Sequence, residues 1–281
     1  TVIDFSFLDP IRGVVGESLI VDIALSGPLN HEGMVLDFSE VKKRLKHAID
    51  HSVDHTLVVP LRSPHLSIIQ STEGTQGKQT QLTFHFGAQS LFLNTPAQSL
   101  FLLGSEQVTA ETMTDALLQT LSPILSPQQT LKLRLYPETI PSAYYHYTHG
   151  LKKHKGHCQR IAHGHRSRIE IYFNDQRQPA LETAWSNQLN TKFLGTKEDQ
   201  CLMRSTHDIY FFSYEAPEGR FELQLPETQC YLMETETTVE YIAEHLATEI
   251  QKQYPDVEKI EVHAFEGVYK GAIATRDIIL K

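Results

Sequence analysis

The sequence lacks most features that mark secreted, membrane-spanning or nucleic-acid-binding proteins. Its three cysteines, Cys158, Cys201 and Cys230, are widely spaced, which argues against a disulfide framework and fits a reducing cytosol. No apolar run is long enough for a transmembrane helix, and residues 1–10 lack the basic and apolar segments of a secretory signal. The net charge of −9 disfavours nucleic acid and anionic membranes as partners. We therefore expect a cytoplasmic globular protein.

Acidic residues are absent from a long central window. Between Glu138 and Glu170 there is no Asp or Glu, whereas six of the 15 histidines and six cations lie there. Such a segment in an acidic chain predicts a pocket for an anionic ligand, and a solvated basic loop is the alternative. We name this window the basic segment, and its cations are Lys152, Lys153, Lys155, Arg160, Arg166 and Arg168.

The length and an internal similarity predict two related units. Of the 281 residues, 40% are apolar, which excludes intrinsic disorder and allows one large domain or two of about 140 residues. Segment 15–25 is similar to 163–173, and segment 108–121 is similar to 237–250. These pairs indicate a tandem duplication, which we divide into residues 1–140 and 141–281.

Hydrophobic periodicity predicts an α+β fold with antiparallel strands and two helices in each half. A capping-box spacing from Asp37 to Glu40 marks the start of one helix. Further helices are expected at 109–121 and 238–252, and 174–204 is expected to be irregular. Strands are expected within 1–30 and at 82–86, 100–103, 131–136, 143–149, 165–173, 207–214, 220–225 and 259–265.

The segment His163-Gly164-His165 is the sharpest candidate for metal binding. In a strand, residues i and i+2 share a face, so the two imidazoles lie about 7 Å apart at Cα and can reach one ion. His149, at the end of the preceding strand, is the natural third ligand. Three histidines leave the fourth position of Zn²⁺ open, which is typical of catalytic zinc. Solvent-facing histidines in a basic loop are the alternative.

Cys158 is the candidate nucleophile or proton carrier. It lies five residues before His163 within the basic segment, where lysines and a bound metal favour the thiolate. The surrounding residues KKHKGHCQR are too polar for a core position, so an inert buried cysteine is the weaker alternative. Cys201 and Cys230 have no such neighbours, and we expect both to be structural.

These motifs resemble those of the 6-pyruvoyl-tetrahydropterin and 6-carboxytetrahydropterin synthase family. HCQRIAHGHRSRIEIYF (157–173) is similar to the zinc-binding segment of that family, with His149 as the preceding ligand. GMVLDFSEVKKRLKHAIDHSVDHTLVV (33–59) resembles the family's GMVxDF helix and contains the pair Asp54-His55. VTAE (108–111) resembles a helix start of the family, and AFEG (264–267) and YPET (136–139) resemble its closing strand.

The resemblance implies a fold, a chemistry and a set of site residues. The fold would be two tandem tunnelling-fold (T-fold) units, each an antiparallel sheet with two helices on one face, that close into a barrel as a homo-oligomer. The activity would be that of a zinc-dependent lyase acting on a dihydropterin triphosphate, with either the 6-pyruvoyl product or the 6-carboxy product that feeds queuosine synthesis. The implied residues are the metal ligands His149, His163 and His165, the catalytic Cys158, Asp54 and His55, and the substrate contacts Glu266, Thr109, Glu111, Lys155 and Arg160.

Some of these assignments leave alternatives open. Glu138 is the alternative to Glu266 as the carboxylate that anchors the pterin, and Glu111 has helix capping as its alternative. Asp54 and His55 could also be a pair at a helix C-terminus, where a histidine is favoured by the dipole.

The two halves depart from the family pattern in complementary ways. Where the first half should have HGH, it has Val15-Gly16-Glu17, and where the second half should have Asp-His, we expect Thr206-His207-Asp208. In the family, the Cys and zinc of one subunit are completed by the Asp-His pair of a neighbour. The tandem chain would therefore supply one whole site, between its own halves or between two chains. A divergent pterin-binding, purine-binding or protein-interaction member without turnover is the alternative.

Overall fold

The first half of the chain forms a five-stranded sheet around a long N-terminal hairpin. The computed structural model describes residues 1–74 and 77–277. Neighbouring strands of this sheet are antiparallel except for two short parallel pairs, β1 with β3 and β3 with β7. In spatial order the strands are β7 (Leu100–Leu103), β3 (Leu57–Pro60), β1 (Val2–Asp9), β2 (Gly13–Ser26) and β8 (Thr130–Pro137).

Two helices pack on this sheet, and both begin as predicted. The carboxylate of Asp37 accepts hydrogen bonds from the first amides of α1 (Phe38–Ser52), which satisfies donors that the helix itself leaves free. Thr109 caps α2 (Ala110–Leu121) through a reciprocal pair of hydrogen bonds with Thr112. The buried stripe of α1 consists of Val41, Leu45 and Ile49.

The second half repeats this order of elements. Helices α3 (Pro179–Leu189) and α4 (Val239–Gln253) pack against its sheet. β11 (Gln176–Arg177) pairs with the end of β10, and the β9–β12 and β12–β15 pairs are parallel. In spatial order the other strands are β15 (Cys230–Met233), β12 (Lys192–Thr196), β9 (Tyr144–His149), β10 (His163–Phe173), β16 (Lys259–Phe265) and β17 (Gly271–Asp277).

A third sheet joins the two halves edge to edge. β6 and β14 each end at a proline followed by a short 3₁₀ turn, and Leu93 of β6 pairs with Leu223 of β14, each three residues before that proline. The hairpin that contains β6 and the hairpin that contains β14 are therefore related by a local twofold axis. In spatial order the strands are β13 (Ile209–Ala216), β14 (Gly219–Pro226), β6 (Gln89–Pro96), β5 (Gly77–Phe86) and β4 (Leu66–Gly74).

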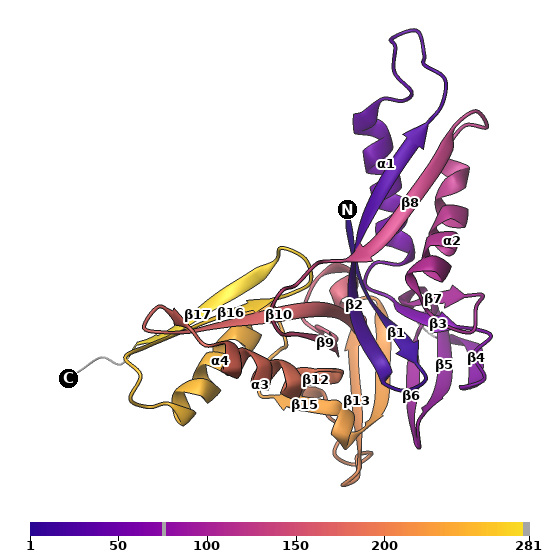
Figure 1. The fold of residues 1–281 in the computed structure, drawn as a ribbon. Coiled ribbons are helices and arrows are strands. Elements are labelled where there is room, and N and C mark those ends of the chain that lie inside the picture. Colours follow the sequence, from indigo (N-terminus) through magenta and orange to yellow (C-terminus); the bar gives the residue numbers. More distant parts are fainter. Residues whose placement is uncertain (75–76, 278–281) are drawn as a thin grey trace.

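The halves also cross at a second point, where β2 packs against β9 and β10. Figure 1 shows β2 and β10 running from this crossing into two arms, one with α1 and α2 and the other with α3 and α4. A Cβ atom on Gly16 would lie 1.9 Å from the carbonyl oxygen of Tyr147. A Cβ atom on Gly164 would lie 2.7 Å from Cα of Gly16. Only glycine allows the backbones to approach so closely.

The architecture confirms the predicted α+β class, with four α-helices among the described residues, and corrects two local predictions. Segment 174–204 is not irregular, because it contains α3 and β12. The buried face of α3 includes Glu182 and Ser186 beside Trp185, so its sequence shows no apolar stripe. The chain also continues beyond β16 into β17, which was not predicted. None of the helices in the described ranges is long and apolar enough to cross a membrane.

Candidate active site

The three predicted metal ligands come together at the start of β10. His163 lies opposite His149 in the β9–β10 ladder, and His165 follows on the same face of β10. One ring nitrogen from each of the three lies within 4.8 Å of the others, and all three side chains are at most 1% exposed. The register of one antiparallel pair is therefore enough to assemble the cluster.

The hydrogen bonds of this cluster set the orientation of two of its rings. Nδ1 of His149 lies 3.0 Å from the carbonyl oxygen of Thr237, and Nδ1 of His163 lies 2.9 Å from that of Arg160. In each ring Nδ1 donates, so Nε2 carries a lone pair, and both Nε2 atoms are buried without a partner. Burial lowers the pKa of His149 and His163 well below the ordinary value, so both rings stay neutral.

Such a cluster fits a divalent transition metal. Buried polar atoms without partners are costly, and neutral imidazole nitrogens that converge within 4.8 Å are the ligands that zinc prefers. No further side chain is needed to make the cluster a three-ligand site with an open position.

The third ring lies between two carboxylates from different halves of the chain. Nδ1 of His165 is 3.3 Å from Oδ1 of Asp4, and Nε2 is 3.6 Å from Oε1 of Glu266. Burial alone would raise the pKa of Asp4, but His165, Lys270 and the Ser18 hydroxyl hold it well below its ordinary range. Asp4 is therefore a buried anion. Asp4 belongs to none of the motifs found in the sequence.

A second cluster shares His163 with the first. Atoms of His55, Cys158 and His163 that could bind a metal also lie within 4.8 Å of one another. Cys158 lies on the short turn η3 (Gly156–Gln159) of the second half, and His55 follows α1 of the first half. The structure thus brings the predicted cysteine and the predicted Asp-His pair together within one chain.

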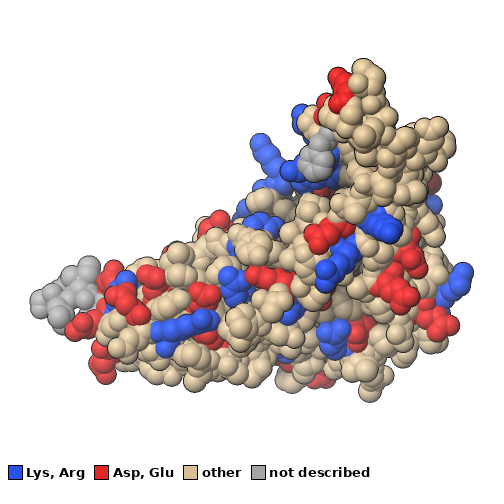
Figure 2. Space-filling view, turned by 45° about the horizontal axis from the view of Figure 1, so that its top comes forward, with Lys and Arg blue, Asp and Glu red and all other residues tan. Residues whose placement is uncertain are grey.

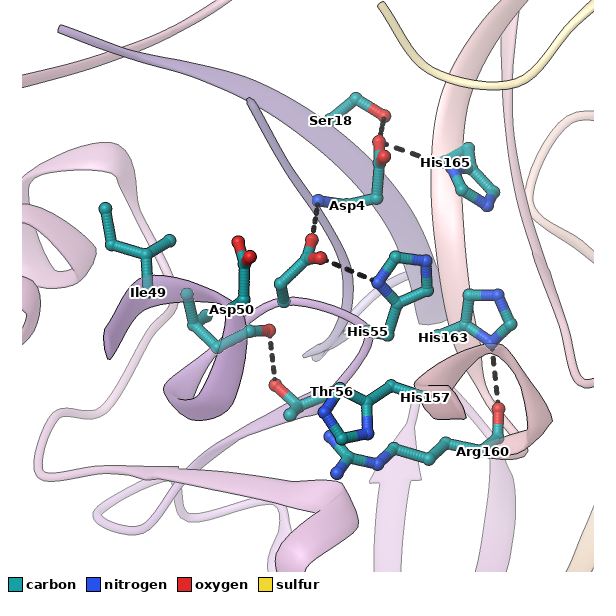
Figure 3. A network of polar contacts seen from close by, with 12 residues as sticks. Asp4, Ser18, Ile49, Asp50, His55, Thr56, His157, Arg160, His163 and His165 are labelled. Atoms are coloured by element: carbon teal, nitrogen blue, oxygen red, sulfur yellow. Dashed lines mark hydrogen bonds and ion pairs between the residues drawn. The ribbon is translucent and has the colours of Figure 1, made fainter. Parts of the chain in front are cut away.

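His55 is held from both sides. Its Nδ1 donates to Oδ2 of Asp54 at 2.8 Å, and its backbone amide donates to the carbonyl oxygen of Asp4 at 2.7 Å. Burial would lower the pKa of His55, but Asp54 and Cys158 together raise it to about 10. The ring is therefore an imidazolium at neutral pH. Figure 3 shows it between Asp4 and His163.

The second half has its own residues at the position of Asp54-His55, and they are not the predicted ones. The Asp54 carboxylate accepts from the amide of Asp4 at 2.8 Å, and Asn190 accepts in the same way from the amide of His146 at 3.0 Å. Thr191 has a φ of 58°, as His55 has one of 55°. Asn190-Thr191 is therefore the structural counterpart of Asp54-His55.

The sequence comparison was wrong in choosing Thr206-His207-Asp208 for that position. The side chains of His207 and Asp208 are 99% and 89% exposed. They contact each other, at 2.9 Å, on the segment before β13. The inverted order of the pair is thus a chance similarity.

The first half also has a counterpart of the histidine cluster, but two of its three residues cannot bind a metal. Phe7 pairs with Val15 in the β1–β2 ladder as His149 pairs with His163 in β9–β10. Glu17 follows on the same face and is the only group of the three that could bind a metal. Burial raises the pKa of Glu17 to about 7. Of the two related positions, only the one in the second half therefore has the three ligands of a candidate metal site.

The cations of the basic segment are mostly paired with acidic residues from elsewhere in the chain. Lys152 lies 2.7 Å from Asp199, and Arg160, only 4% exposed, lies 2.7 Å from Glu218. Lys153 and Arg168 form ion pairs as well, and Arg166 donates to a backbone carbonyl. Among residues 1–74 and 77–277, Lys155 forms no ion pair and is exposed. Figure 2 shows basic and acidic side chains intermixed on the face in view.

The remaining predicted substrate contacts lie in different places. Glu266 follows β16 and lies beside His165, whereas Glu138 follows β8 and pairs with Arg168 at 3.1 Å. Thr109 and Glu111 lie at the exposed start of α2, where Thr109 bonds to its own helix. The geometry therefore places Glu266 at the histidine cluster and leaves the substrate contacts of Thr109 and Glu111 as predictions.

The fold and the site together define a tandem T-fold protein with a buried histidine cluster. The family model described as 6-pyruvoyl tetrahydropterin synthase matches twice, over residues 14–148 and 139–276. The chain therefore belongs to the 6-pyruvoyl tetrahydropterin synthase family. No curated protein sequence matches it.

Solved structures of the same family are similar to half of the chain. The 6-pyruvoyl tetrahydropterin synthase of Plasmodium falciparum is 13% identical, with a TM-score of 0.39, over 50% of this chain and 94% of its own. That of Plasmodium vivax is 13% identical, with a TM-score of 0.38, over 48% of this chain and 92% of its own.

Proposed function

We propose that this chain is a zinc-dependent tetrahydropterin synthase, a lyase that acts on a dihydropterin triphosphate. The observation that supports this most strongly is the position of His163. It belongs both to the histidine cluster of the second half and to the group formed by Cys158 and His55. A protein that only binds a pterin has no need for a metal site, a cysteine and a charged histidine at one point.

His149, His163 and His165 would hold the zinc ion, because their converging nitrogens otherwise remain buried without partners. Zinc supplies a positive charge that stabilises negative charge developing on an oxygen of the substrate side chain. The chain contributes the orientation of the rings. Thr237 and Arg160 fix two of them through backbone carbonyls.

Cys158, His55 and Asp54 would move the proton. As a thiolate, Cys158 would take a proton from a carbon of the substrate side chain, and the imidazolium of His55 would return a proton to the substrate, so that the number of protons on the Cys-His pair stays the same. Asp54 keeps the imidazolium of His55 charged and fixes its tautomer through the 2.8 Å contact with Nδ1. Both members of the dyad come from the half that lacks the zinc ligands.

Glu266 would hold the pterin. A carboxylate can accept two parallel hydrogen bonds from the guanidine-like edge of that ring. Glu266 lies beside the cluster and belongs to the same half as Cys158, whereas Glu138 is engaged by Arg168. Lys155 remains the most available cation of the basic segment for a triphosphate, since it is exposed, while acidic partners neutralise Lys152, Lys153, Arg160 and Arg168, and Arg166 donates to a backbone carbonyl. Arg160 would contribute only if substrate displaced Glu218.

Turnover of dihydroneopterin triphosphate by zinc-loaded protein tests the function. We expect tetrahydropterin product from the wild type and turnover about 10²–10⁴-fold slower from Cys158→Ala, and the mass of the product distinguishes the 6-pyruvoyl from the 6-carboxy reaction. Cys201→Ala is the matched control, because Cys201 is also a partly exposed free cysteine and lies away from the cluster. Tight pterin binding without turnover would instead identify a binding protein.

Assembly into a homo-oligomer is part of the same proposal. β8 and β17 each end a sheet, so each has an unpaired edge in the described structure. Exposed edges can pair with another chain. Light scattering would measure the mass in solution, and a monomer at the concentration of the activity assay would contradict the assembly.

A further inference from the structure

Asp4 is a carboxylate of the first half that lies against the metal cluster of the second half. Its side chain is 4% exposed, and three groups surround it. Oδ1 accepts from the Ser18 hydroxyl at 2.6 Å and lies 3.3 Å from Nδ1 of His165, while Oδ2 lies 2.9 Å from Nζ of Lys270. Figure 3 shows Asp4 between Ser18 and His165.

The backbone of Asp4 reaches the other part of the site. Its amide donates to Oδ1 of Asp54, and its carbonyl oxygen accepts from the amide of His55. One residue thus contacts a candidate metal ligand with its side chain and the Asp-His dyad with its main chain. Gly267 closes the remaining space, because a Cβ there would lie 2.4 Å from Oδ1 of Asp4.

His165 differs from the other two ligands in the group that faces Nδ1. His149 and His163 donate to backbone carbonyls, whereas His165 faces a charged carboxylate. A carboxylate on the far nitrogen of a ligating histidine fixes the tautomer and raises the basicity of the ligating nitrogen. Asp4 can therefore act on the metal through His165 without touching it.

The counterpart position of the second half lacks this carboxylate. His146 makes the same backbone hydrogen bonds to Asn190 and Thr191 that Asp4 makes to Asp54 and His55. Its Nδ1, however, lies 2.7 Å from the carbonyl oxygen of Gly16. The fold therefore tolerates an uncharged side chain at this position. The backbone arrangement does not require a carboxylate, and the carboxylate of Asp4 occurs where the histidine cluster lies.

We propose that Asp4 is a positioning residue for the metal centre, supplied by the half that has no metal ligands. The carboxylate orients His165 so that its Nε2 faces the metal, and Lys270 and Ser18 hold the carboxylate in place. This inference rests on the proposed zinc site. It also means that zinc affinity, and not only catalysis, depends on contact between the two halves.

The test is zinc affinity of the full chain, measured by competition with a chromogenic chelator, together with the visible spectrum of the cobalt(II) form. Asp4→Asn keeps the shape and removes the charge, and we expect zinc affinity to fall about 10-fold or more, with altered cobalt bands. Glu222→Gln is the matched control, since Glu222 is also a buried carboxylate that links the halves, through Asn94 at 2.8 Å. It should change stability but not zinc affinity.

A folded Asp4→Asn protein with wild-type zinc affinity and unchanged cobalt bands would overturn the proposal. If Asp4→Asn does not fold, Lys270→Met decides, because Lys270 is half exposed and its ion pair is with Asp4. A smaller loss of zinc affinity supports the role, and wild-type affinity overturns it. Absence of zinc from the wild type would overturn the proposed function together with this role, whereas equal binding by wild type and variants overturns the role of Asp4 alone.

Discussion

At the crossing of β2 and β10, the second half has His163 and His165 where the first half has Val15 and Glu17. Both pairs flank a glycine, and both strands pair with a preceding strand in the same register. The backbone at the Asp-His position is also repeated, down to the positive φ of His55 and of Thr191. The same backbone hydrogen bonds therefore maintain the fold at both related positions, while the reactive side chains occupy only one of them.

Zinc content is the largest expected difference between the two positions. We expect wild-type protein to contain about one zinc ion per chain and His163→Ala to contain almost none, since the loss of one imidazole leaves only two of the three protein ligands that such a site needs. Glu17→Gln should leave the zinc content at one. Atomic emission measures the metal, and a value near two per chain would show that the first-half position also binds it.

Turnover should depend on the pair Asp54-His55 and not on the exposed pair His207-Asp208. Cys158→Ala and His55→Ala should each lower kcat by about 10²–10⁴-fold while zinc stays bound, because proton transfer is lost and the ligands remain. The double variant should be little worse than either single one. His207→Ala should leave kcat unchanged, because His207 is almost fully exposed. Equal losses at His55 and His207 would contradict the assignment.

The crossing itself should be sensitive to any side chain. Gly16→Ala and Gly164→Ala each place a methyl group within 2.3 Å of the Tyr147 carbonyl oxygen, where backbone must move. We expect the free energy of unfolding to fall by about 3 kcal/mol or more. Gly104→Ala is the control, because no atom lies within 4 Å of its added Cβ. Urea unfolding measures all three, and equal stability of the variants would mean that the halves can separate here.

The smallest expected effect is a pH dependence from Glu17. Burial raises its pKa from 4.5 to about 7, so the folded protein binds this proton more tightly than the unfolded chain. The stability that results is present below about pH 4.5 and is lost as the pH rises to 7. Glu17→Gln should therefore gain about 3 kcal/mol over wild type between pH 4.5 and 7.5. Parallel stability curves from urea unfolding across this range would contradict the shift.

The motifs with fixed spacing could be found from the sequence alone. His163 and His165 share a face because strand geometry has a period of two, and the caps of α1 and α2 follow from the residue types at Asp37 and Thr109. The duplication is also visible, because repeated segments keep their apolar pattern. These features depend only on neighbours along the chain.

The substrate contacts were harder to find. The basic segment predicted a pocket for an anionic ligand, but Asp199 and Glu218, which pair with two of its cations, come from distant parts of the sequence. The unit boundary at 140 and 141 falls between β8 and β9 and stays a prediction. Helix α3 was missed because its buried face carries a carboxylate that pairs with Arg177.

What the sequence by itself determined is most of the local elements, the duplicated pattern and the candidate histidine cluster with its cysteine, since each depends on residues close together in the chain. Only the tertiary structure decided which surfaces of the halves meet. Residues 3–7 alternate between apolar and polar, which predicts a strand with one solvated face, yet Asp4 and Ser6 are buried. The second half covers that face, and long-range packing of this kind turns an apparently exposed aspartate into a buried neighbour of His165.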